Sequence, residues 1–295
     1  MNYRHVFHAG NHADVLKHVV LLALCEALTQ KPAACFALDT HAGRGLYALD
    51  DEAAQRTGEA NDGVARLLTK SSADPWVMRY LEAIAACRSA HGTHAYPGSP
   101  WLLAHALRPV DRIACCELQP DEAAALKANL GRDPRVAIHQ RDGYAALKGL
   151  LPPNAGGQRF GRGLVLIDPP YEAQLDEFDH ALAALRDGLS RWPQAIYMLW
   201  YPIKLRRTLM PFYRDAAHLP AKSVVLAELL VRPDDSPLRM NGSGLLLLNA
   251  PYRFDAALTT TLATLSTMLA PIAPLPRAPL PPAPLSRVER LKAPA

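Results

Sequence analysis

Residues 163–171 read Gly163-Leu164-Val165-Leu166-Ile167-Asp168-Pro169-Pro170-Tyr171. The apolar run at the start is typical of a strand buried on both faces of a parallel sheet. The two prolines lack backbone donors and end the strand, so Asp168 stands at its carboxyl end. Ligands of open α/β sheets bind at that end of the strands. The stretch therefore predicts an α/β fold with a ligand site around Asp168.

The rest of the chain alternates short apolar runs with helical patterns, which favours an α/β fold around a mostly parallel sheet. The first helix is expected over residues 12–29, with Asn11 as its N-cap. Seven strands are expected, at residues 34–39, 112–117, 135–142, 163–168, 195–200, 223–231 and 244–249. Further helices are expected at residues 121–130, 175–189, 205–217 and 255–269.

Two segments interrupt this alternation. Residues 50–96 show helical patterns but no convincing strand, which predicts a small helical insertion. Residues 271–295 contain eight prolines, a density that predicts a disordered or polyproline-like tail. We therefore divide the chain into a main α/β domain, an inserted helical subdomain and a tail, covering residues 1–49 with 97–270, 50–96 and 271–295. The cations of the tail are Arg277, Arg287, Arg290 and Lys292, and a solvated tail is favoured over a phosphate-binding one.

The composition narrows the class of protein. With 49% hydrophobic residues the chain suits a globular core, and no run reaches the roughly 20 apolar residues of a membrane span. The longest candidate, at residues 19–25, ends at Glu26, and the N-terminus has no signal-peptide core, so we expect a soluble cytoplasmic protein. Five cysteines without a Cys-x-x-Cys pair predict buried thiols, with Cys115 and Cys116 on opposite faces of a strand. A net charge of +4 permits a nucleic-acid partner without requiring one.

The chemistry expected at Asp168 is transfer of a group to an exocyclic amine. The lone pair of such an amine is delocalised into its ring, and two acceptors that hold both N–H groups would free it. Asp168 and the carbonyl of Pro169 are those acceptors, and Asp168 can take the surplus proton, a contribution of ~10²–10⁴-fold. Tyr171 would stack on the ring, for about 1–3 kcal/mol. An incidental aspartate before a strand terminator explains less, because other strand ends carry acids as well.

Three more strand ends are acidic. Asp39 ends the first strand and precedes a turn with Gly43, although the turn lacks the G-x-G-x-x-G pattern of dinucleotide sites. Glu117 ends the second strand, where it could hold two ribose hydroxyls, and Asp142-Gly143 ends the third, where it suits an adenine amino group. Each acid alone is more often a surface or cap residue. Together they predict a nucleoside-containing cofactor.

Four histidines crowd the N-terminus, at His5, His8, His12 and His18. They lack acids or cysteines at regular ligand spacing, so capping, packing or cofactor contacts are favoured over a metal site.

Several blocks of sequence accompany the Asp-Pro-Pro-Tyr motif. They are Tyr3-Arg4-His5, His8-Ala9-Gly10-Asn11-His12-Ala13-Asp14-Val15-Leu16-Lys17-His18, Leu38-Asp39-Thr40-His41-Ala42-Gly43, Arg56-Thr57-Gly58-Glu59, Tyr96-Pro97-Gly98-Ser99-Pro100 and Leu199-Trp200-Tyr201-Pro202. With them the chain resembles the class I S-adenosylmethionine-dependent amino-methyltransferases and, more closely, the RlmJ family. The resemblance runs from about residue 2 to 253. The N-terminal block is specific to that family, whereas Asp-Pro-Pro-Tyr is shared by many amino-methyltransferases.

The resemblance implies a Rossmann-like fold and methylation of N6 of one adenine in 23S ribosomal RNA. It implies Asp168 as the catalytic acceptor. The residues it places around S-adenosyl-L-methionine are His18, His41, Ser99, Glu117, Asp142, Gly143 and Asp168. Those it places near the target base or its phosphates are Tyr3, His5 and Lys17, beside the Pro169 and Tyr171 already assigned to the base. Arg44 is large for its turn, and Ser99-Pro100 also suits a helix N-cap with its first-turn proline.

We expect a monomer that acts on protein-free 23S rRNA or an early precursor, with no membrane partner. The candidate contacts to the RNA backbone are Arg4, Lys17, Arg206, Arg207, Lys222, Arg232 and Arg239. Three alternatives stay open at this point. They are another acceptor (guanine-N2 of rRNA, DNA adenine-N6 or cytosine-N4), a non-catalytic ribosome-assembly factor, and a nicotinamide enzyme. The intact Asp168 motif disfavours the second, and the missing glycine pattern disfavours the third.

Overall fold

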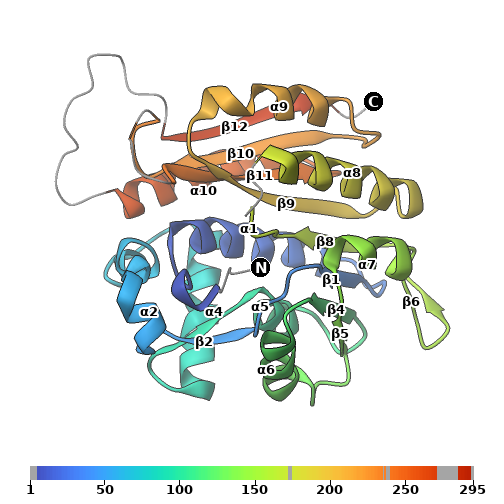
Figure 1. Ribbon diagram of the computed structural model, residues 1–295, viewed down its shortest axis with the longest axis horizontal. Coiled ribbons are helices and arrows are strands. Elements are labelled where there is room, and N and C mark those ends of the chain that lie inside the picture. Colours follow the sequence, from blue (N-terminus) through green and yellow to red (C-terminus); the bar gives the residue numbers. More distant parts are fainter. Residues whose placement is uncertain (1–4, 172–174, 235, 237–239, 271–284, 294–295) are drawn as a thin grey trace.

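The computed structural model describes residues 5–171, 175–234, 236, 240–270 and 285–293 (Figure 1). An eight-stranded sheet runs through the molecule in the order β12-β10-β11-β9-β8-β1-β4-β5. Its strands are β1 (Phe36–Asp39), β4 (Arg112–Glu117), β5 (Val136–Gln140), β8 (Gly163–Ile167), β9 (Ile196–Ile203), β10 (Val224–Leu230), β11 (Gly242–Leu248) and β12 (Ser286–Lys292). The predicted α/β fold with a mostly parallel sheet is therefore confirmed.

Five neighbouring strands of the sheet are parallel, namely β5, β4, β1, β8 and β9. Their carboxyl ends therefore share one edge of the sheet. β11 runs antiparallel to β9 and β10, and β12 runs antiparallel to β10. In β8, Leu164 and Leu166 face one apolar core while Val165 and Ile167 face the other. Burial on both faces explains why this strand reads as a continuous apolar run.

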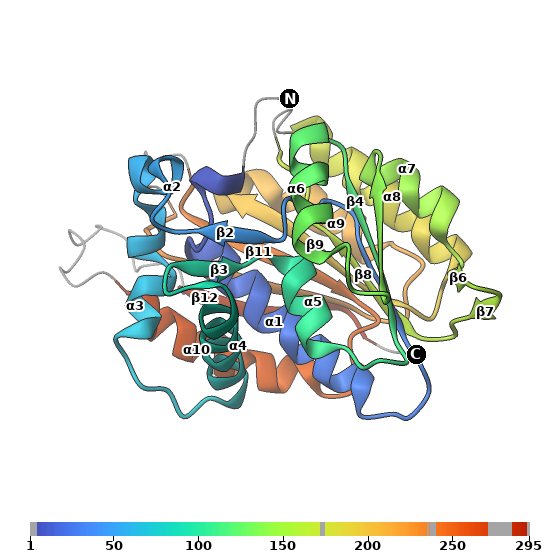
Figure 2. The ribbon, with the colours of Figure 1, turned by 90° about the horizontal axis from the view of Figure 1, so that it is seen from below.

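Helices cover both faces of the sheet (Figure 2). The first core holds α1 (His12–Thr29), α4 (Pro75–His91), α5 (Ser99–Ala106), α6 (Pro120–Leu130) and α10 (Phe254–Leu269). The second holds α7 (Gly143–Leu150), α8 (Leu175–Arg191) and α9 (Met210–Ala217). α1 begins where predicted, and the Asn11 side chain accepts from the Ala13 and Asp14 N–H groups.

The prediction of seven strands was wrong by one, because β12 is an eighth. Residues 286–292 were assigned to a disordered tail, yet they form this strand against β10. The physical reason is local: the segment itself contains no proline and follows the last of the clustered ones at Pro284. Residues 271–284 of the predicted tail lie outside the described residues.

A buried carboxylate anchors β12. Glu228 of β10 is fully buried and accepts from the Tyr201 hydroxyl at 2.9 Å and from the Tyr213 hydroxyl. It pairs with Arg206 at 2.9 Å and with Arg287 of β12 at 3.5 Å. The outer strand is therefore tied through its own arginine to the strand beside it, β10.

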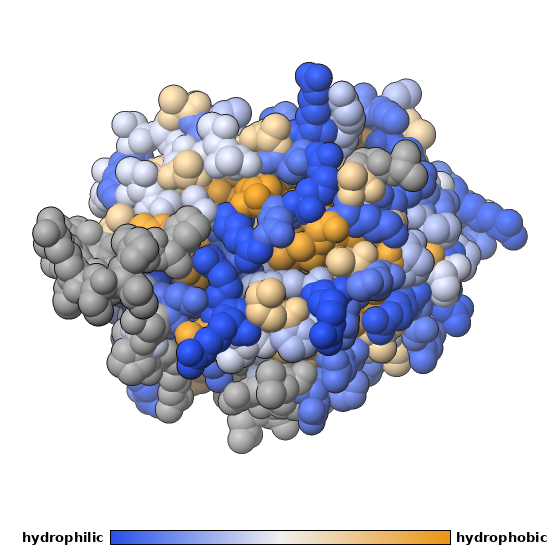
Figure 3. All heavy atoms as spheres, turned by 90° about the horizontal axis from the view of Figure 1, so that it is seen from above, coloured by the Kyte–Doolittle hydropathy of each residue, from blue (hydrophilic) through white to orange (hydrophobic). Residues whose placement is uncertain are grey.

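β12 is an edge strand, since it pairs only with β10 among the strands described. Four of its seven residues, Arg287, Glu289, Arg290 and Lys292, are charged, which discourages pairing with another chain. The face seen from above is mostly hydrophilic, with apolar area in a narrow central strip (Figure 3). The cations of β12 have partners within the chain: Arg290 contacts Asp255, and Lys292 donates to the Leu219 carbonyl.

The segment at residues 50–96 is helical apart from its end. It holds α2 (Glu52–Thr57), η2 (Glu59–Asp62), α3 (Val64–Leu68) and α4, and β3 (Ala95–Pro97) pairs antiparallel with β2 (Leu46–Ala48). Glu59 accepts from Asn11 at 2.9 Å and lies 3.0 Å from His8. Thr57 donates to the Phe7 carbonyl, so this segment holds the N-terminal turn η1 (His5–Phe7) in place.

The remaining elements are short. They are the hairpin β6 (Asn154–Ala155) and β7 (Gln158–Arg159) and the turn η3 (Arg206–Leu209), which with α9 replaces one predicted helix. All five cysteines are buried and free, and Cys115 and Cys116 lie in different cores as predicted. Among the helices described, none has the length and apolar content required to cross a bilayer.

Candidate active site

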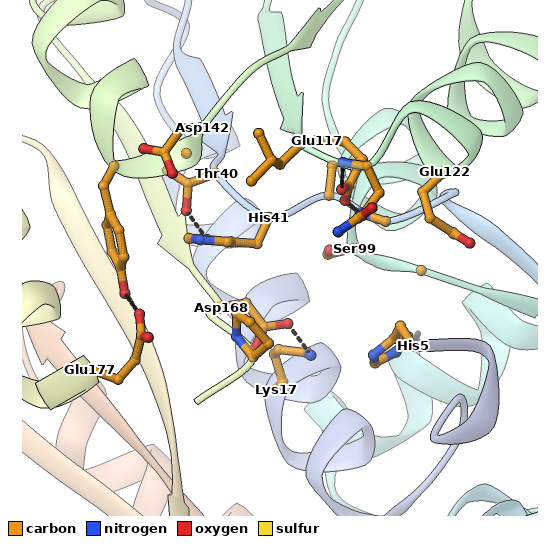
Figure 4. Close-up of a pocket in the computed structure, with 18 of the residues that line it drawn as sticks. His5, Lys17, Thr40, His41, Ser99, Glu117, Glu122, Asp142, Asp168 and Glu177 are labelled. Atoms are coloured by element: carbon orange, nitrogen blue, oxygen red, sulfur yellow. Dashed lines mark hydrogen bonds and ion pairs between the residues drawn. The ribbon is translucent and has the colours of Figure 1, made fainter. Parts of the chain in front are cut away.

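A cavity of about 230 Å³ opens at the carboxyl ends of β1, β4, β5 and β8 (Figure 4). Its lining includes most of the predicted site residues, namely His5, Lys17, His18, His41, Ser99, Glu117, Asp142, Gly143 and Asp168. These residues come from seven separate parts of the chain and meet only in the folded protein. The strand-end acids Glu117, Asp142 and Asp168 therefore meet at one edge of the sheet, as the sequence predicts.

Asp168 is held by a lysine from the first helix. The ammonium group of Lys17 donates to Asp168 Oδ2 and lies 3.1 Å from Asp14 Oδ1 (Figure 4). Burial lowers the pKa of Lys17, but the two carboxylates outweigh burial and raise the pKa above its ordinary value. Lys17 is therefore a fixed cation, and the other oxygen of Asp168 is the one that can accept a hydrogen bond from a bound molecule.

Asp14 connects this pair to the N-terminal turn. The imidazole of His5 lies 3.0 Å from Asp14 Oδ2, which also accepts the Gly10 N–H at 2.9 Å. Burial would raise the pKa of Asp14, but His5 and Lys17 hold that pKa well below its usual range. The ring of His5 packs 5.1 Å from that of Tyr47. One buried carboxylate thus positions both His5 and Lys17.

The predicted strand-end acids have distinct surroundings. Glu117 accepts the Gly43 N–H at 2.9 Å and the Gln119 N–H at 2.7 Å, while burial raises its pKa. Asp142 caps α7 by accepting the Ala145 N–H at 2.7 Å. Asp39 is completely buried, and burial raises its pKa to about 7. Glu117 and Asp142 line the cavity, whereas Asp39 lies beneath it.

Two glycines allow the backbone to approach closely here. Gly43 has φ +59°, and a Cβ at this position would lie 2.3 Å from the hydroxyl of Tyr47. A Cβ on Gly143 would lie 2.0 Å from the Thr40 carbonyl oxygen. Neither position accepts a side chain without a local shift, which explains the glycines of both loops.

The two histidines assigned to the cofactor are neutral. His18 shares a hydrogen bond of 3.0 Å with the Tyr96 hydroxyl, and burial lowers its pKa to about 3. His41 shares one of 2.7 Å with the Thr40 hydroxyl, and burial lowers its pKa to about 4. Both can therefore donate or accept hydrogen bonds at neutral pH without adding charge to the cavity.

Among the residues of the cavity wall that sequence reasoning missed, three form a group on α7 and α8. Tyr144, at the start of α7, donates to Glu177 of α8 at 2.6 Å, and its ring meets His41 edge-on. His180, one turn after Glu177, lines the same wall. Glu177 and His180 are an i, i+3 pair of polar residues on α8, and this spacing was the signal available in the sequence.

The structure does not bring two of the predicted base contacts into the cavity. Tyr171 is buried at 8% exposure with φ +50°, and its hydroxyl donates to the Trp200 carbonyl at 3.0 Å. Its ring packs against Phe178, so in this conformation it does not face a base. Pro169 is buried and is absent from the cavity lining, where Pro170 stands instead. The predicted contact at Tyr3 lies outside the described residues.

Two local predictions need correction. Ser99 is the first residue of α5 rather than its N-cap, which is Gly98 without a side-chain bond. Arg44 does not obstruct its turn, because its guanidinium turns outward to Glu122 at 2.6 Å.

The structure corrects one of the seven candidate contacts to the RNA backbone, because Lys17 is buried and paired with Asp14 and Asp168. The other six candidate cations fall into three groups. Arg206 is committed to Glu228, and Lys222 lies at the far end of the sheet, beside Asn249. Arg207 and Arg232 lie in the loops that follow β9 and β10, at the same end as the cavity. Arg4 and Arg239 lie outside the described residues.

Comparisons with known proteins agree with this geometry. The family model described as "Ribosomal RNA large subunit methyltransferase D, RlmJ" matches residues 32–274. The "Ribosomal RNA large subunit methyltransferase J" of Escherichia coli K12 is 35% identical over 271 residues, covering 92% of this chain and 95% of the relative. The protein of that name from Haemophilus influenzae is 35% identical over 272 residues, with the same coverage. A crystal structure of a Legionella pneumophila protein superposes with a TM-score of 0.79 at 30% identity, covering 96% of this chain and 97% of that one.

Proposed function

The chain belongs to the RlmJ family of ribosomal RNA large subunit methyltransferases, and we propose on that basis that it methylates the exocyclic N6 of one adenine in 23S rRNA. The methyl donor is S-adenosylmethionine. The observation that carries the proposal is the position of Asp168, which stands in the wall of the cavity with one oxygen bound to Lys17. The site residues named from the sequence are proposed in the same roles, apart from Tyr171 and Pro169, which do not line the cavity, and Lys17, which is bound to Asp168.

The cavity suits this cofactor in charge and in hydrogen-bonding groups. The described lining carries five carboxylates, from Glu117, Glu122, Asp142, Asp168 and Glu177, and two of its histidines are neutral. Arg44 pairs with Glu122 and Lys17 pairs with Asp168, so the carboxylates still outnumber these cations. S-adenosylmethionine carries a sulfonium and an ammonium against one carboxylate, so its net positive charge is complementary to the cavity. Glu117 would hold the ribose hydroxyls, and Asp142 with the Gly143 N–H would hold the adenine edge.

When bound, the cofactor supplies an electrophilic methyl group on sulfur. Asp168 would accept one N–H of the target amine and so localise the nitrogen lone pair for attack on that methyl carbon. The proton that becomes surplus leaves toward the same carboxylate, a role worth ~10²–10⁴-fold in rate. Lys17 orients Asp168 by holding Oδ2, and His5 closes the cavity from the N-terminal side.

The target adenine must leave its stack to reach this cavity, at a cost of a few kcal/mol. Three cations stand at the same end of the sheet, Lys204 and Arg207 after β9 and Arg232 after β10, with Lys204 and Arg207 exposed. We assign the phosphates next to the target adenine to these three cations, because the lining of the cavity itself is acidic. We also propose a monomeric cytoplasmic enzyme that uses protein-free 23S rRNA or an early precursor.

Methyl transfer from labelled S-adenosylmethionine to transcribed 23S rRNA tests the proposal. We expect N6-methyladenosine at one site, and Asp168→Ala should lower kcat by at least ~100-fold, a larger effect than its effect on cofactor Kd. Asp176→Asn, in the exposed first turn of α8, is the matched control and should retain activity. Label in N2-methylguanosine or in DNA would identify a different acceptor, and full activity of Asp168→Ala would contradict the assigned role.

A further inference from the structure

A second cavity lies at the opposite end of the sheet from Asp168. The loop at residues 249–253 joins β11 to α10, beside the amino ends of β9 and β8. The cavity measures about 250 Å³, and its lining includes Ser223, Pro251, Tyr252, Arg253, Asp255 and Arg290. None of these residues takes part in the methyl-transfer site.

The loop is held rigidly by its first residue. Asn249 has φ +58°, accepts the Lys222 N–H at 2.8 Å and donates to the Pro193 and Ala195 carbonyls at 3.0 and 2.8 Å. Arg253 at the other end also has φ +58°. Asparagine adopts such a conformation readily, whereas an arginine keeps it only where its surroundings impose it. The fold therefore fixes the shape of a loop that contributes little to either core.

This loop presents an aromatic ring to solvent. Tyr252 is 86% exposed, and the guanidinium of Arg253 lies 5.2 Å from its ring centre. Isolated exposed apolar side chains are common and need no explanation. Here the exposed ring instead borders a cavity. The loop that carries the ring is fixed by the side-chain hydrogen bonds of Asn249.

The charge around the ring favours one class of partner. Lys222 and Arg253 are exposed, and Arg290 lines the cavity, while Asp255 is the acid of the lining and is paired with Arg290. An accessible ring face beside cations is the arrangement that stacks an unpaired base and holds its phosphates. A protein partner would require a larger apolar area than one tyrosine supplies.

We propose that Tyr252 and Arg253 form a second RNA-binding site, which stacks an unpaired base of the rRNA remote from the nucleotide being methylated. The site rests on the proposed function for its partner, and it deepens that function by giving the enzyme a second point of attachment. It raises affinity for long RNA without touching the reacting groups.

Steady-state kinetics on transcribed 23S rRNA test this site. Tyr252→Ala should raise KM for the RNA roughly 5- to 150-fold, the range that corresponds to loss of one stacked base, while kcat and cofactor Kd stay unchanged. Tyr252→Phe keeps the ring and should behave as wild type. Val110→Ala removes another exposed apolar side chain at the same end of the sheet and should have no effect.

Photocrosslinking gives an independent reading. A 4-thiouridine-substituted 23S transcript should crosslink to the peptide that contains Tyr252, and mass spectrometry of the digested complex identifies it. An unchanged KM without a crosslink overturns the site, and so does a Tyr252→Ala variant that loses self-association in sedimentation but binds RNA normally. If wild-type protein methylates no RNA, the proposed function fails, whereas the crosslink still decides whether Tyr252 binds RNA.

Discussion

Asp39, a single residue beneath the site, makes the stability of the folded protein depend on pH. Burial raises its pKa to about 7 from 3.8, so the folded state holds a proton that the unfolded state has released above pH ~4. The contribution of protonated Asp39 to the free energy of unfolding is fully present below the pKa of the unfolded chain. It is lost as pH rises through 7. Full ionisation costs on the order of 4 kcal/mol.

Asp39→Asn should remove this dependence. We expect the variant to gain stability relative to wild type as pH rises from 5 to 8, measured by urea unfolding at several pH values. Buried histidines such as His18 and His41 act in the opposite direction, but they are common to both proteins and cancel in the difference. A constant difference between variant and wild type across this range would show that Asp39 does not titrate there.

At this scale the sequence identified acids and histidines but not their partners. Asp168, Glu117 and Asp142 follow apolar strands, and the strand-end rule places such residues together without any coordinates. The bond from Lys17 to Asp168 joins residues far apart in the chain, and no spacing rule predicts it. The ring of Tyr171 packs against Phe178 and Trp200, so it does not face a base as predicted.

Among the elements, β12 depends on a buried ion cluster that can be tested alone. Removing one partner of a buried pair costs about 3–5 kcal/mol, because the other charge stays behind without compensation. Glu228→Gln leaves Arg206 and Arg287 facing a neutral amide, so we expect a loss of about 3 kcal/mol in the free energy of unfolding, measured in urea.

Glu289→Gln is the matched control for that variant. Glu289 also contacts Arg287, but from the solvent side, where its side chain is 44% exposed. Exposed pairs contribute about 0–1 kcal/mol, so this change should be nearly silent. Equal losses from both variants would mean that the cluster around Glu228 is not what holds β12.

The expected elements matched the structure where their periodic pattern was long. All seven strands expected from the sequence are present, and the first helix has the predicted limits of 12–29. The antiparallel pair β2–β3 and the hairpin β6–β7 have strands of two or three residues, too short for an alternating pattern. β12 was missed because the neighbouring prolines dominated the composition of its segment.

At the scale of the whole molecule, the helical segment at residues 50–96 positions the N-terminal turn over the cavity. Glu59 carries this contact, since it bonds to His8 and Asn11 and raises the pKa of His8. Glu59→Gln should loosen the segment that bears His5. We expect KM for RNA to rise roughly 5-fold, in line with about 1 kcal/mol for one hydrogen bond, with faster amide exchange over residues 5–11.

Glu52→Gln provides the comparison within the same segment. Its pair with Arg56 is exposed and touches neither η1 nor the cavity, so kinetics and exchange should match wild type. If Glu59→Gln leaves both measurements unchanged, the helical segment does not hold the N-terminal turn through this residue.

The packing of α1 has a consequence for the chain during its synthesis. Fifteen of its 18 residues are buried, and it packs against α4 and α5 and also against β8, β11 and α10. β11 is translated about two hundred residues after α1, and at 5–20 residues per second this takes roughly 10–40 s. α4 and α5 are made early, but the rest of the apolar surface of α1 stays uncovered until β11 and α10 are made. Nascent chains that stop before β11 should therefore need chaperones to stay soluble.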